Sequence, residues 1–277
     1  MNGLDFGSRT FIMGILNLTP DSFSGDGLHN DVDRAVEEAE RIAGEGADII
    51  DIGGESTRPG AEPVPLEEEI KRVVPVVERL ARKIKIPISV DTRKSEVALR
   101  ALDKGASIIN DITGLEYDNR MTDVVARYDA GVIIMHIKGE PRTMQKSPVY
   151  GNLIKEILEK LTDLVERAEK SGIKKENIIV DPGIGFGKTF DHNLEILNNL
   201  SVFRGMGKPI LVGTSRKSFI GNILDAEPRE RIWGVAASVA ISINNGADIV
   251  RVHDVKQMKQ VAMVADAIVK NRERIHA

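Results

Sequence analysis

Short apolar runs rich in Ile and Val recur about every 35 residues along this 277-residue chain, and helical patterns separate them. Strands that alternate with helices are typical of βαβ units, which build a parallel sheet covered by helices. The runs are nearly continuous in Ile and Val, so the strands are expected to be buried on both faces. The eight predicted strands span residues 11–18, 48–52, 86–90, 107–112, 132–136, 177–180, 209–212 and 248–252.

The number of these units favours a closed barrel over a doubly wound open sheet. The chain length of 277 residues also matches a barrel of eight βα units. There is no domain linker, low-complexity stretch or basic tail. We therefore predict the α/β class, with a single-domain (β/α)8 TIM barrel over residues 1–277.

The segments between the runs show the 3.6-residue period of amphipathic helices. The first segment places Val32, Val36, Ala39 and Ala43 on one stripe, and the last segment does the same with Met258, Val261, Ala265 and Ile268. Glycines that follow a helical stretch are expected to end it in the left-handed conformation. Those glycines are Gly46, Gly105 and Gly172.

Composition excludes several classes of function. A net charge of −4 argues against a general nucleic-acid binder, although a few focused cations can still hold an anionic substrate. The chain has no cysteine, which excludes disulfides and thiolate metal sites and favours a reducing compartment. No apolar run approaches the roughly 20 residues of a membrane span, and residues 1–8 do not resemble a secretory signal. We expect a cytoplasmic protein with no membrane or nucleic-acid partner.

Polar residues follow the apolar runs at the point where each predicted strand ends. In a (β/α)8 barrel these ends meet at the carboxyl rim, where active sites lie. A carboxylate buried at such a place loses hydration unless a partner compensates, so Asp91 and Asp181 need partners. The polar positions are Asn17, Glu55, Asp91, Asn110, Asp111, His136, Asp181, Thr214, Ser215, Arg251 and His253.

Each of these residues also has a structural interpretation. Asp91 alone could be the N-cap of the next helix, and Asn110 alone could bond to neighbouring backbone. His253 alone is more often a packed or surface residue, while Asp51 and Asp111 are expected to bond to loops beneath the rim. Their occurrence together favours a site, because independent structural accidents would scatter over both ends of the barrel.

Four polar or glycine-rich segments refine this prediction. Residues 17–24 and 53–60 combine Gly, Pro and small hydroxyl residues, as in loops that close over a ligand. Residues 181–188 are glycine-rich but lack the strand, turn and acidic residue of a dinucleotide fingerprint. Residues 215–218 (Ser-Arg-Lys-Ser) place cations where a helix is expected to begin, which predicts an anion site. An ordinary surface loop or a solvated basic pair is the alternative.

These segments, in this order, resemble those of bacterial dihydropteroate synthases across essentially the whole chain. The matching segments are 17–24, 53–60, 108–111, 181–186, 213–221 and 250–254. One departure occurs in the first loop, where the chain reads Ser22-Phe23-Ser24-Gly25-Asp26-Gly27 and the family usually reads Ser-Phe-Ser-Asp-Gly-Gly. The shifted acid leaves Asp26 without a firm role.

The resemblance implies a reaction, a metal and an assembly. The family condenses 6-hydroxymethyl-7,8-dihydropterin diphosphate with 4-aminobenzoate to give 7,8-dihydropteroate and pyrophosphate, with Mg²⁺, and it is a target of sulfonamides. A homodimer is the family expectation. Two rivals remain: a pterin-dependent methyltransferase, which would not need the Ser-Thr-Arg-Pro and Ser-Arg-Lys-Ser segments, and a catalytically silent pterin-binding barrel.

The resemblance also assigns residues to each substrate. The pterin would be bound by Asp91, Asn110, Ile112, Met135, Asp181, Phe186 and Lys217. The diphosphate would be bound by Asn17, Arg58, Arg251 and His253, with Asn17 also a Mg²⁺ ligand. The 4-aminobenzoate would be bound by Thr57, Arg58, Pro59, Phe186, Lys217 and Ser218. The residues expected to act in catalysis are Asp91, Lys217, Arg251 and His253.

The chemistry of these groups suggests how the reaction proceeds. An arylamine is neutral at physiological pH, so it needs no general base before it attacks. The difficult step is breaking the C–O bond to the diphosphate. Arg251, His253 and Mg²⁺ would stabilise the leaving group, and Asp91 would stabilise positive charge on the pterin. This favours a dissociative path, although an associative one stays open.

Overall fold

The computed structural model describes residues 4–19, 31–58 and 60–275, and in this part of the chain eight parallel strands form one sheet. The strand order is β6-β5-β4-β3-β2-β1-β8-β7, and a bridge between Val180 and Ile210 brings β6 beside β7 to close the barrel. The strands are β1 (Phe11–Asn17), β2 (Ile49–Gly53), β3 (Ile88–Asp91), β4 (Ile108–Asp111), β5 (Gly131–Met135), β6 (Ile178–Asp181), β7 (Leu211–Val212) and β8 (Ile249–Val252).

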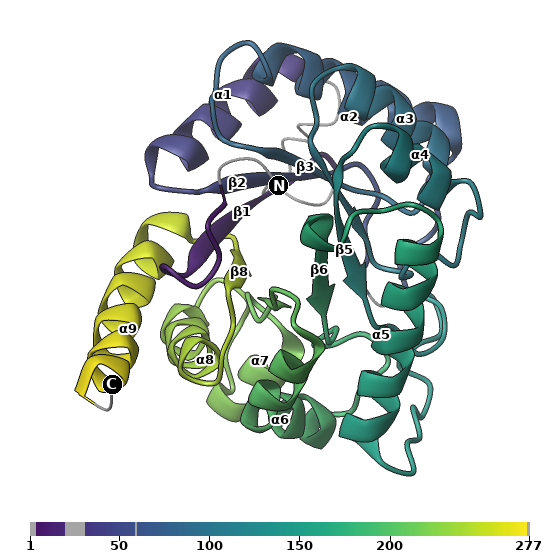
Figure 1. The fold of residues 1–277 in the computed structure, drawn as a ribbon. Helices are drawn as coiled ribbons and strands as arrows, with labels where there is room; N and C mark the ends of the chain where they lie inside the picture. The colour runs from purple at the N-terminus through teal and green to yellow at the C-terminus, as the bar shows by residue number, and fades with distance from the viewer. Residues whose placement is uncertain (1–3, 20–30, 59, 276–277) are drawn as a thin grey trace.

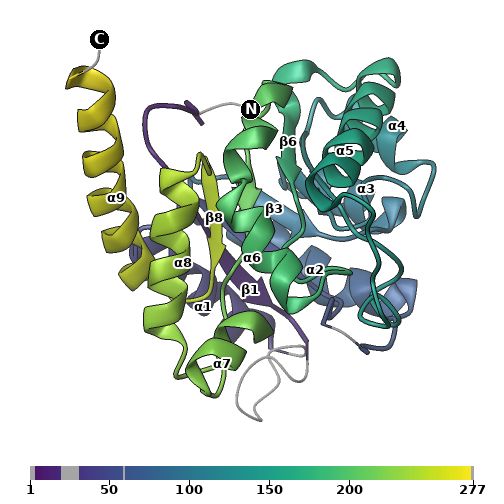
Figure 2. The same ribbon diagram turned by 90° about the horizontal axis from the view of Figure 1, so that it is seen from below.

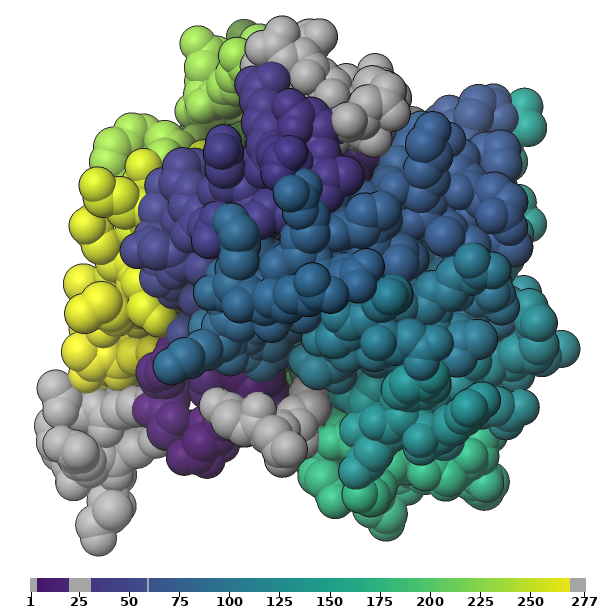
Figure 3. Space-filling view, turned by 90° about the horizontal axis from the view of Figure 1, so that it is seen from above, coloured from purple at the N-terminus to yellow at the C-terminus, as the bar shows by residue number. Residues whose placement is uncertain are grey.

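Helices surround the strands as an outer ring (Figure 1). Two helices, α7 and α8, lie between β7 and β8. In the described residues the helices are α1 (Val32–Gly44), α2 (Leu66–Leu80), α3 (Ser95–Asp103), α4 (Met121–Arg127), α5 (Leu153–Lys170), α6 (Phe190–Asn198), α7 (Ser218–Leu224), α8 (Ile232–Asn244) and α9 (Val255–Ile275). From above, α1 and α2 cover one side of the barrel and α9 lies at its flank (Figure 3).

The predicted (β/α)8 barrel is confirmed, and each strand begins and ends within two residues of its predicted bounds. The three glycines predicted to end helices all have positive φ: 104° at Gly46, 109° at Gly105 and 95° at Gly172. The stripe on α1 faces inward as expected. On α9 one position was wrong, because Ile268 is 53% exposed and does not join the core.

Alternating side chains of the strands fill two separate cores. One set packs inside the barrel, and it is made of Phe11, Met13, Ile49, Ile108, Ile133, Ile179, Leu211 and Ile249, with Leu4 and Phe6 of the amino-terminal segment against it. The alternate strand residues, such as Ile12, Ile50 and Val250, pack outward against the helices. This two-residue period decides which side chains reach the interior at the end of each strand.

The barrel has two distinct ends (Figure 2). The amino-terminal segment and the last turns of α9 lie at one end, and α7 lies at the other, which is the carboxyl rim. Within the described residues, no helix is long and apolar enough to cross a membrane.

Candidate active site at the carboxyl rim of the barrel

The polar side chains of the rim point inward because of the two-residue period of the strands. Each lies two residues after an apolar side chain that packs inside the barrel: Asp51 after Ile49, Asn110 after Ile108, Asp181 after Ile179 and Arg251 after Ile249. The same alternation brings Asn17 and Asp91 to the interior of their strand ends. The strands therefore gather these residues at one end of the molecule, as predicted.

Arg251 is the centre of a charged network at this rim. Its Nε donates to Asp51 Oδ2 at 2.6 Å, and its Nη2 donates to Asp91 Oδ2 at 2.8 Å. Asn110 Nδ2 donates to the same Asp51 oxygen at 3.2 Å. Asn17 lies beside this group, because Asn17 Oδ1 and Asp91 Cβ are each 3.6 Å from the position that a Cβ would occupy at Gly53.

The network changes the proton affinity of its members. Burial raises the pKa of Asp91 to about 7, with Asp51 acting in the same direction and Arg251 opposing it. Burial tends to lower the pKa of Arg251, but Asp51 and Asp91 outweigh it and raise that pKa above its usual value. Arg251 therefore stays charged, while Asp91 can gain a proton near neutral pH.

The structure confirms one of the structural interpretations and corrects two. Asp111 bonds to the loop beneath the rim, through Thr113 and the Leu115 amide, as expected. Asp51 does not bond to a loop; its partners are the site side chains Arg251 and Asn110. Asp91 is not the N-cap of α3, because that position belongs to Lys94.

Asp181 lies at the end of β6 with its side chain almost fully buried. Its Oδ1 accepts a hydrogen bond from the Gly183 amide at 2.7 Å. Burial raises the pKa of Asp181 to about 6; the Gly183 amide, Lys188, Lys217 and Arg251 oppose this rise. A buried carboxylate with surrounding cations suits a ligand that brings its own N–H donors.

A small apolar cluster adjoins Asp181 at the rim. It contains Ile112, Met135, Met144 and Phe186. Met144 was not predicted, since it lies in the long β5–α5 connection where no periodic pattern marks it. Apolar side chains beside a carboxylate suit a heterocycle that combines an apolar ring with N–H donors.

Lys217 lies over this cluster. Its Nζ is 4.1 Å from the centroid of the Phe186 ring, a cation–π contact. Burial lowers the pKa of Lys217 to about 8, and Arg251 acts in the same direction while Asp181 and Asp91 oppose it. Ser218, the next residue, is exposed at the start of α7.

His253 is neutral in this environment. Burial lowers its pKa to about 3, and the charges of Arg216, Arg251, Arg58 and Lys217 act in the same direction. Ser215 Oγ lies 2.9 Å from His253 Nδ1 and accepts a hydrogen bond from the His253 amide at 3.2 Å. The Ser215 hydroxyl thus holds the ring through Nδ1, and the other ring nitrogen, Nε2, is left for a ligand.

The loop after β2 reaches the same rim. Glu55 anchors the start of this loop. Its Oε2 accepts a hydrogen bond from the Val64 amide at 3.0 Å, and its Oε1 accepts one from Arg93 Nη2 at 2.8 Å. Thr57 is half-buried in this loop and Arg58 is exposed. The predicted residue Pro59 and the first-loop residue Asp26 lie outside the described residues.

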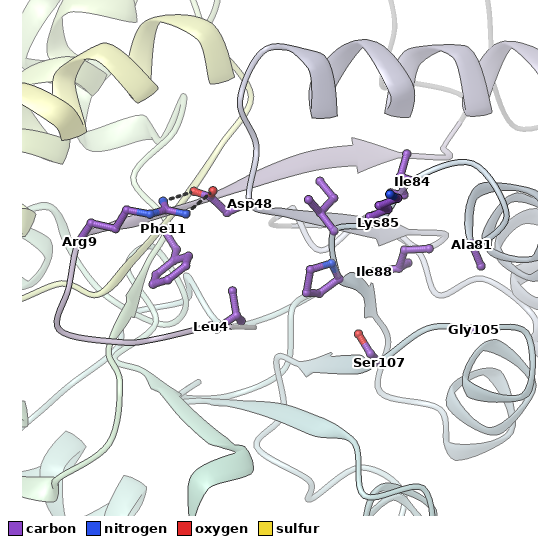
Figure 4. Close-up of a pocket in the computed structure, with 12 residues that line it drawn as sticks. Leu4, Arg9, Phe11, Asp48, Ala81, Ile84, Lys85, Ile88, Gly105 and Ser107 are labelled. Carbon is purple, nitrogen blue, oxygen red and sulfur yellow. Dashed lines mark hydrogen bonds and ion pairs between the residues drawn. The ribbon is translucent and has the colours of Figure 1, made fainter. Parts of the chain in front are cut away.

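A separate cavity lies at the opposite end of the barrel (Figure 4). It has a volume of about 440 Å³ and lies between the amino-terminal segment and the starts of β3 and β4. Arg9 in its wall is paired with Asp48 at 2.8 Å, and Leu4, Phe11 and Ile88 supply apolar surface. It contains none of the predicted site residues, so the polar rim and not this cavity is the candidate active site.

The rim suits a hard metal ion held mainly by substrate. Among the described residues, no group of three or more His, Cys, Asp and Glu side chains could hold a metal ion by itself. Asn17 brings an amide oxygen to the network of Asp91 and Arg251. Mg²⁺ keeps several waters and binds phosphate oxygens, so one protein oxygen at the rim is compatible with it.

Fold and rim together define an enzyme of the pterin-binding class on a (β/α)8 barrel, and the comparisons agree. The family of pterin binding enzymes matches residues 13–253. The dihydropteroate synthase of Synechocystis is 49% identical over 95% of this chain and 92% of its own length.

Solved structures agree as well. A Yersinia pestis dihydropteroate synthase in a sulfonamide complex matches with a TM-score of 0.92 and 43% identity, over 97% of this chain and 96% of that one. The Xanthomonas albilineans synthase, solved with 7,8-dihydropteroate, matches with a TM-score of 0.85 and 38% identity over 94% of both chains. The same enzyme solved with 4-aminobenzoic acid gives a TM-score of 0.88 and 42% identity, over 94% of this chain and 93% of that one. The chain belongs to the dihydropteroate synthases within the pterin-binding family.

Proposed function

We infer that the protein is a transferase of folate biosynthesis that joins a dihydropterin to 4-aminobenzoate and releases pyrophosphate. The observation that carries this function is the convergence at one rim of Asp181, Lys217 and the Arg251 network, beside a small apolar surface. That set offers a carboxylate for the pterin edge and cations for its diphosphate. The family membership supports the same reaction.

The pterin is proposed to lie on the apolar cluster with its pyrimidine edge toward Asp181. A carboxylate can accept two hydrogen bonds from the amino group and the ring N–H of that edge. Lys217 would donate to the ring carbonyl, and Asn110 would lie beside Asp181. Ile112, Met135 and Phe186 would contact the faces of the ring, with Met144 as an additional contact.

The diphosphate is proposed to lie between Arg251, His253 and Asn17. Since His253 is neutral, it would donate a hydrogen bond from Nε2 and not act as a second cation. Mg²⁺ held by Asn17 would add positive charge at the phosphate oxygens when bound. Arg58 contributes to the potential around His253 and is suited to the same anion.

The 4-aminobenzoate is proposed to enter from the loop after β2. Thr57, Arg58 and Pro59 would form one wall, and Phe186 with Lys217 the other. Its carboxylate would lie near Ser218 at the start of α7. In this arrangement the arylamine would lie above the pterin, on the side from which it can attack the methylene carbon.

Catalysis is proposed to be mainly electrostatic. The neutral arylamine needs no general base, so the protein acts on the departing diphosphate and on the pterin. Asp91, when ionised, would stabilise positive charge that develops on the pterin ring as the C–O bond breaks. Arg251 is shared between Asp51 and Asp91 and would stabilise the negative charge on the other side of that bond.

Removal of the charge on Asp91 tests this proposal. Asp91→Asn is expected to lower turnover by on the order of a hundredfold or more, because a charge aimed at the developing transition state is lost. The measurement is pyrophosphate release from pterin diphosphate, Mg²⁺ and 4-aminobenzoate. The same assay on the unmodified protein separates the synthase from a methyltransferase or a silent barrel, and wild-type turnover in Asp91→Asn would refute the role of this residue.

We also propose that two copies associate through α7, α8 and α9, which are adjacent in the fold. These helices carry large apolar side chains that the single chain leaves exposed, among them Trp233 at 81%, Ile241, Met263, Val264 and Ile268. Trp233 is the sole tryptophan of the sequence, so its fluorescence should shift to shorter wavelength as protein concentration rises. Ile241→Glu is expected to prevent that shift and yield a monomer in sedimentation.

The cytoplasmic location expected from the sequence stays a prediction.

A further inference from the structure

A lysine is completely buried beneath the pterin side of the site, and the function above does not use it. Lys188 is 2% exposed and lies in the loop between β6 and α6, directly before the N-cap Thr189. Its Nζ lies 3.0 Å from the Phe186 carbonyl oxygen, 3.2 Å from the His136 carbonyl oxygen and 2.9 Å from His136 Nδ1. Three acceptors match the three N–H groups of an ammonium ion.

These contacts join the end of β5 to the loop that carries Phe186. His136 follows β5 directly, and its amide donates to the Asp181 carbonyl oxygen at 2.9 Å. The chain makes a tight turn at Gly183, between Asp181 and Phe186, and Gly183 has φ of +72°. A Cβ at Gly183 would lie 2.0 Å from the His136 carbonyl oxygen and 3.2 Å from Lys188 Nζ, so no other residue fits there. The ammonium thus supports both the turn and the Phe186 segment.

The same turn connects Lys188 to Asp181. The Gly183 amide donates to Asp181 Oδ1 at 2.7 Å, and a Cβ at Gly183 would lie 3.2 Å from Lys188 Nζ. Besides Lys188, the charged groups that face Asp181 are Lys217 from the β7–α7 loop and Arg251 from β8. All three favour its ionised form against the effect of burial.

The surroundings of Lys188 also define its own charge. Burial lowers its pKa to about 7, with Lys217 and Lys138 acting in the same direction and Asp181 opposing them. Burial lowers the pKa of His136 to about 2, so its ring is neutral and Nδ1 can accept a hydrogen bond. Near pH 6, where Asp181 titrates, Lys188 therefore carries its proton.

We propose that Lys188 is a positioning residue for pterin binding, which holds the Gly183–Phe186 turn against β5 and supplies a positive charge that keeps Asp181 ionised. This inference rests on the proposed role of Asp181 at the pterin edge. Lys188 acts through Asp181 and Phe186 and does not contact the substrate itself.

The test compares two variants with a matched control. Lys188→Met removes the charge and all three hydrogen bonds, whereas Lys188→Gln keeps an amide that can donate to the carbonyls but carries no charge. The control is Lys208→Met. Lys208 is also largely buried, and its Nζ bonds to Glu169 Oε1 at 2.7 Å and to the Lys175 carbonyl oxygen at 2.9 Å, at the opposite end of the barrel.

The readout is the affinity for 6-hydroxymethyl-7,8-dihydropterin diphosphate with Mg²⁺, measured by calorimetry between pH 5 and 8.5. Binding to the wild type should weaken as pH falls through the pKa of Asp181. In Lys188→Met we expect Kd to rise tenfold or more and the pH midpoint to move up by about one unit, since a nearby opposite charge is lost. Lys188→Gln should show the same midpoint shift with a smaller change in Kd at high pH.

Lys208→Met should melt at a lower temperature but keep the wild-type Kd and midpoint. Equal losses in Lys208→Met, or a wild-type midpoint in Lys188→Gln, would overturn the proposal. Circular dichroism reports whether each variant folds. If Lys188→Met does not fold, the pH midpoint of Lys188→Gln tests the proposed role of the Lys188 charge. If Asp181→Asn binds the pterin as the wild type does, then the proposed function of Asp181 has failed, which is a separate outcome.

Discussion

The charged groups at the two ends of the barrel differ in burial and in how their charge is compensated. At the amino end Asp48 is held by Arg9 and Lys259, and these partners lower its pKa although burial opposes them. At the carboxyl rim burial raises the pKa of Asp91 to about 7 and that of Asp181 to about 6, although cations lie close by. The ionised form of the rim carboxylates is thus destabilised in the folded protein, and a ligand that donates hydrogen bonds to them can offset that cost.

The difference lies in how each end compensates its charge. Arg9 and Asp48 form two parallel hydrogen bonds at 2.8 Å, a closed pair that leaves little for a ligand. Arg251 instead spans two carboxylates, and Asp51 Oδ1 is buried with no hydrogen-bond partner among the described residues. At the carboxyl rim the hydrogen-bonding capacity of the charged groups is only partly used, which is typical of a functional site. At the amino end it is used within the ion pair, which is typical of a contact that stabilises the fold.

The largest effect should come from removing the central arginine at each end. Arg251→Met is expected to lower kcat/KM by roughly a thousandfold, because the variant lacks the cation proposed to stabilise the leaving group, and Asp51 and Asp91 lose their partner. Arg9→Met should leave kcat/KM near the wild-type value and lower the free energy of unfolding. Pyrophosphate release and urea denaturation measure the two quantities. Equal losses of activity in both variants would erase the contrast between the ends.

The pH dependence of kcat/KM should separate the two ends next. The proposed reaction requires ionised Asp181 and Asp91, so kcat/KM should fall about tenfold per unit as pH decreases below 7, and more steeply below 6. It should also fall above about 8, where Lys217 loses its proton. Asp48 has a lowered pKa, so its stabilising ion pair persists over this range and is lost only in stronger acid. Stopped assays and thermal melts from pH 5 to 9 test this; a melting temperature that tracks the activity would contradict it.

The smallest effect concerns stability. The raised pKa of Asp181 stabilises the fold only while the group is protonated, and that contribution is lost as pH rises through about 6. Asp181→Asn should therefore raise the unfolding free energy at pH 8 by about 1 kcal/mol while pterin binding is lost. Asp48→Asn should lower it by about 2 kcal/mol, because hydrogen bonds to charged groups are removed. Denaturation curves at pH 8 give both free energies of unfolding. Changes of the same sign in the two variants would contradict the proposed difference between the two ends of the barrel.

Much of the site could be predicted because strand periodicity is a local property. The eight apolar runs set the strands, and a residue two positions after an inward apolar side chain must also point inward. Asp181 after Ile179 and Arg251 after Ile249 follow from this rule alone. The glycines at the helix ends also follow from local chemistry.

Other features depended on contacts between distant parts of the chain. Arg251 lies 200 residues from Asp51 and 160 from Asp91 in the sequence, and no local pattern indicates that it pairs with these two carboxylates. Met144, the neutral state of His253 and the buried position of Lys188 have the same origin. The sequence by itself determined the strands, the helices and the rim on which polar residues gather, because those follow from hydrophobic periodicity. Only barrel closure decided the partners and the proton affinities, because both depend on burial and on charges that long-range packing brings together.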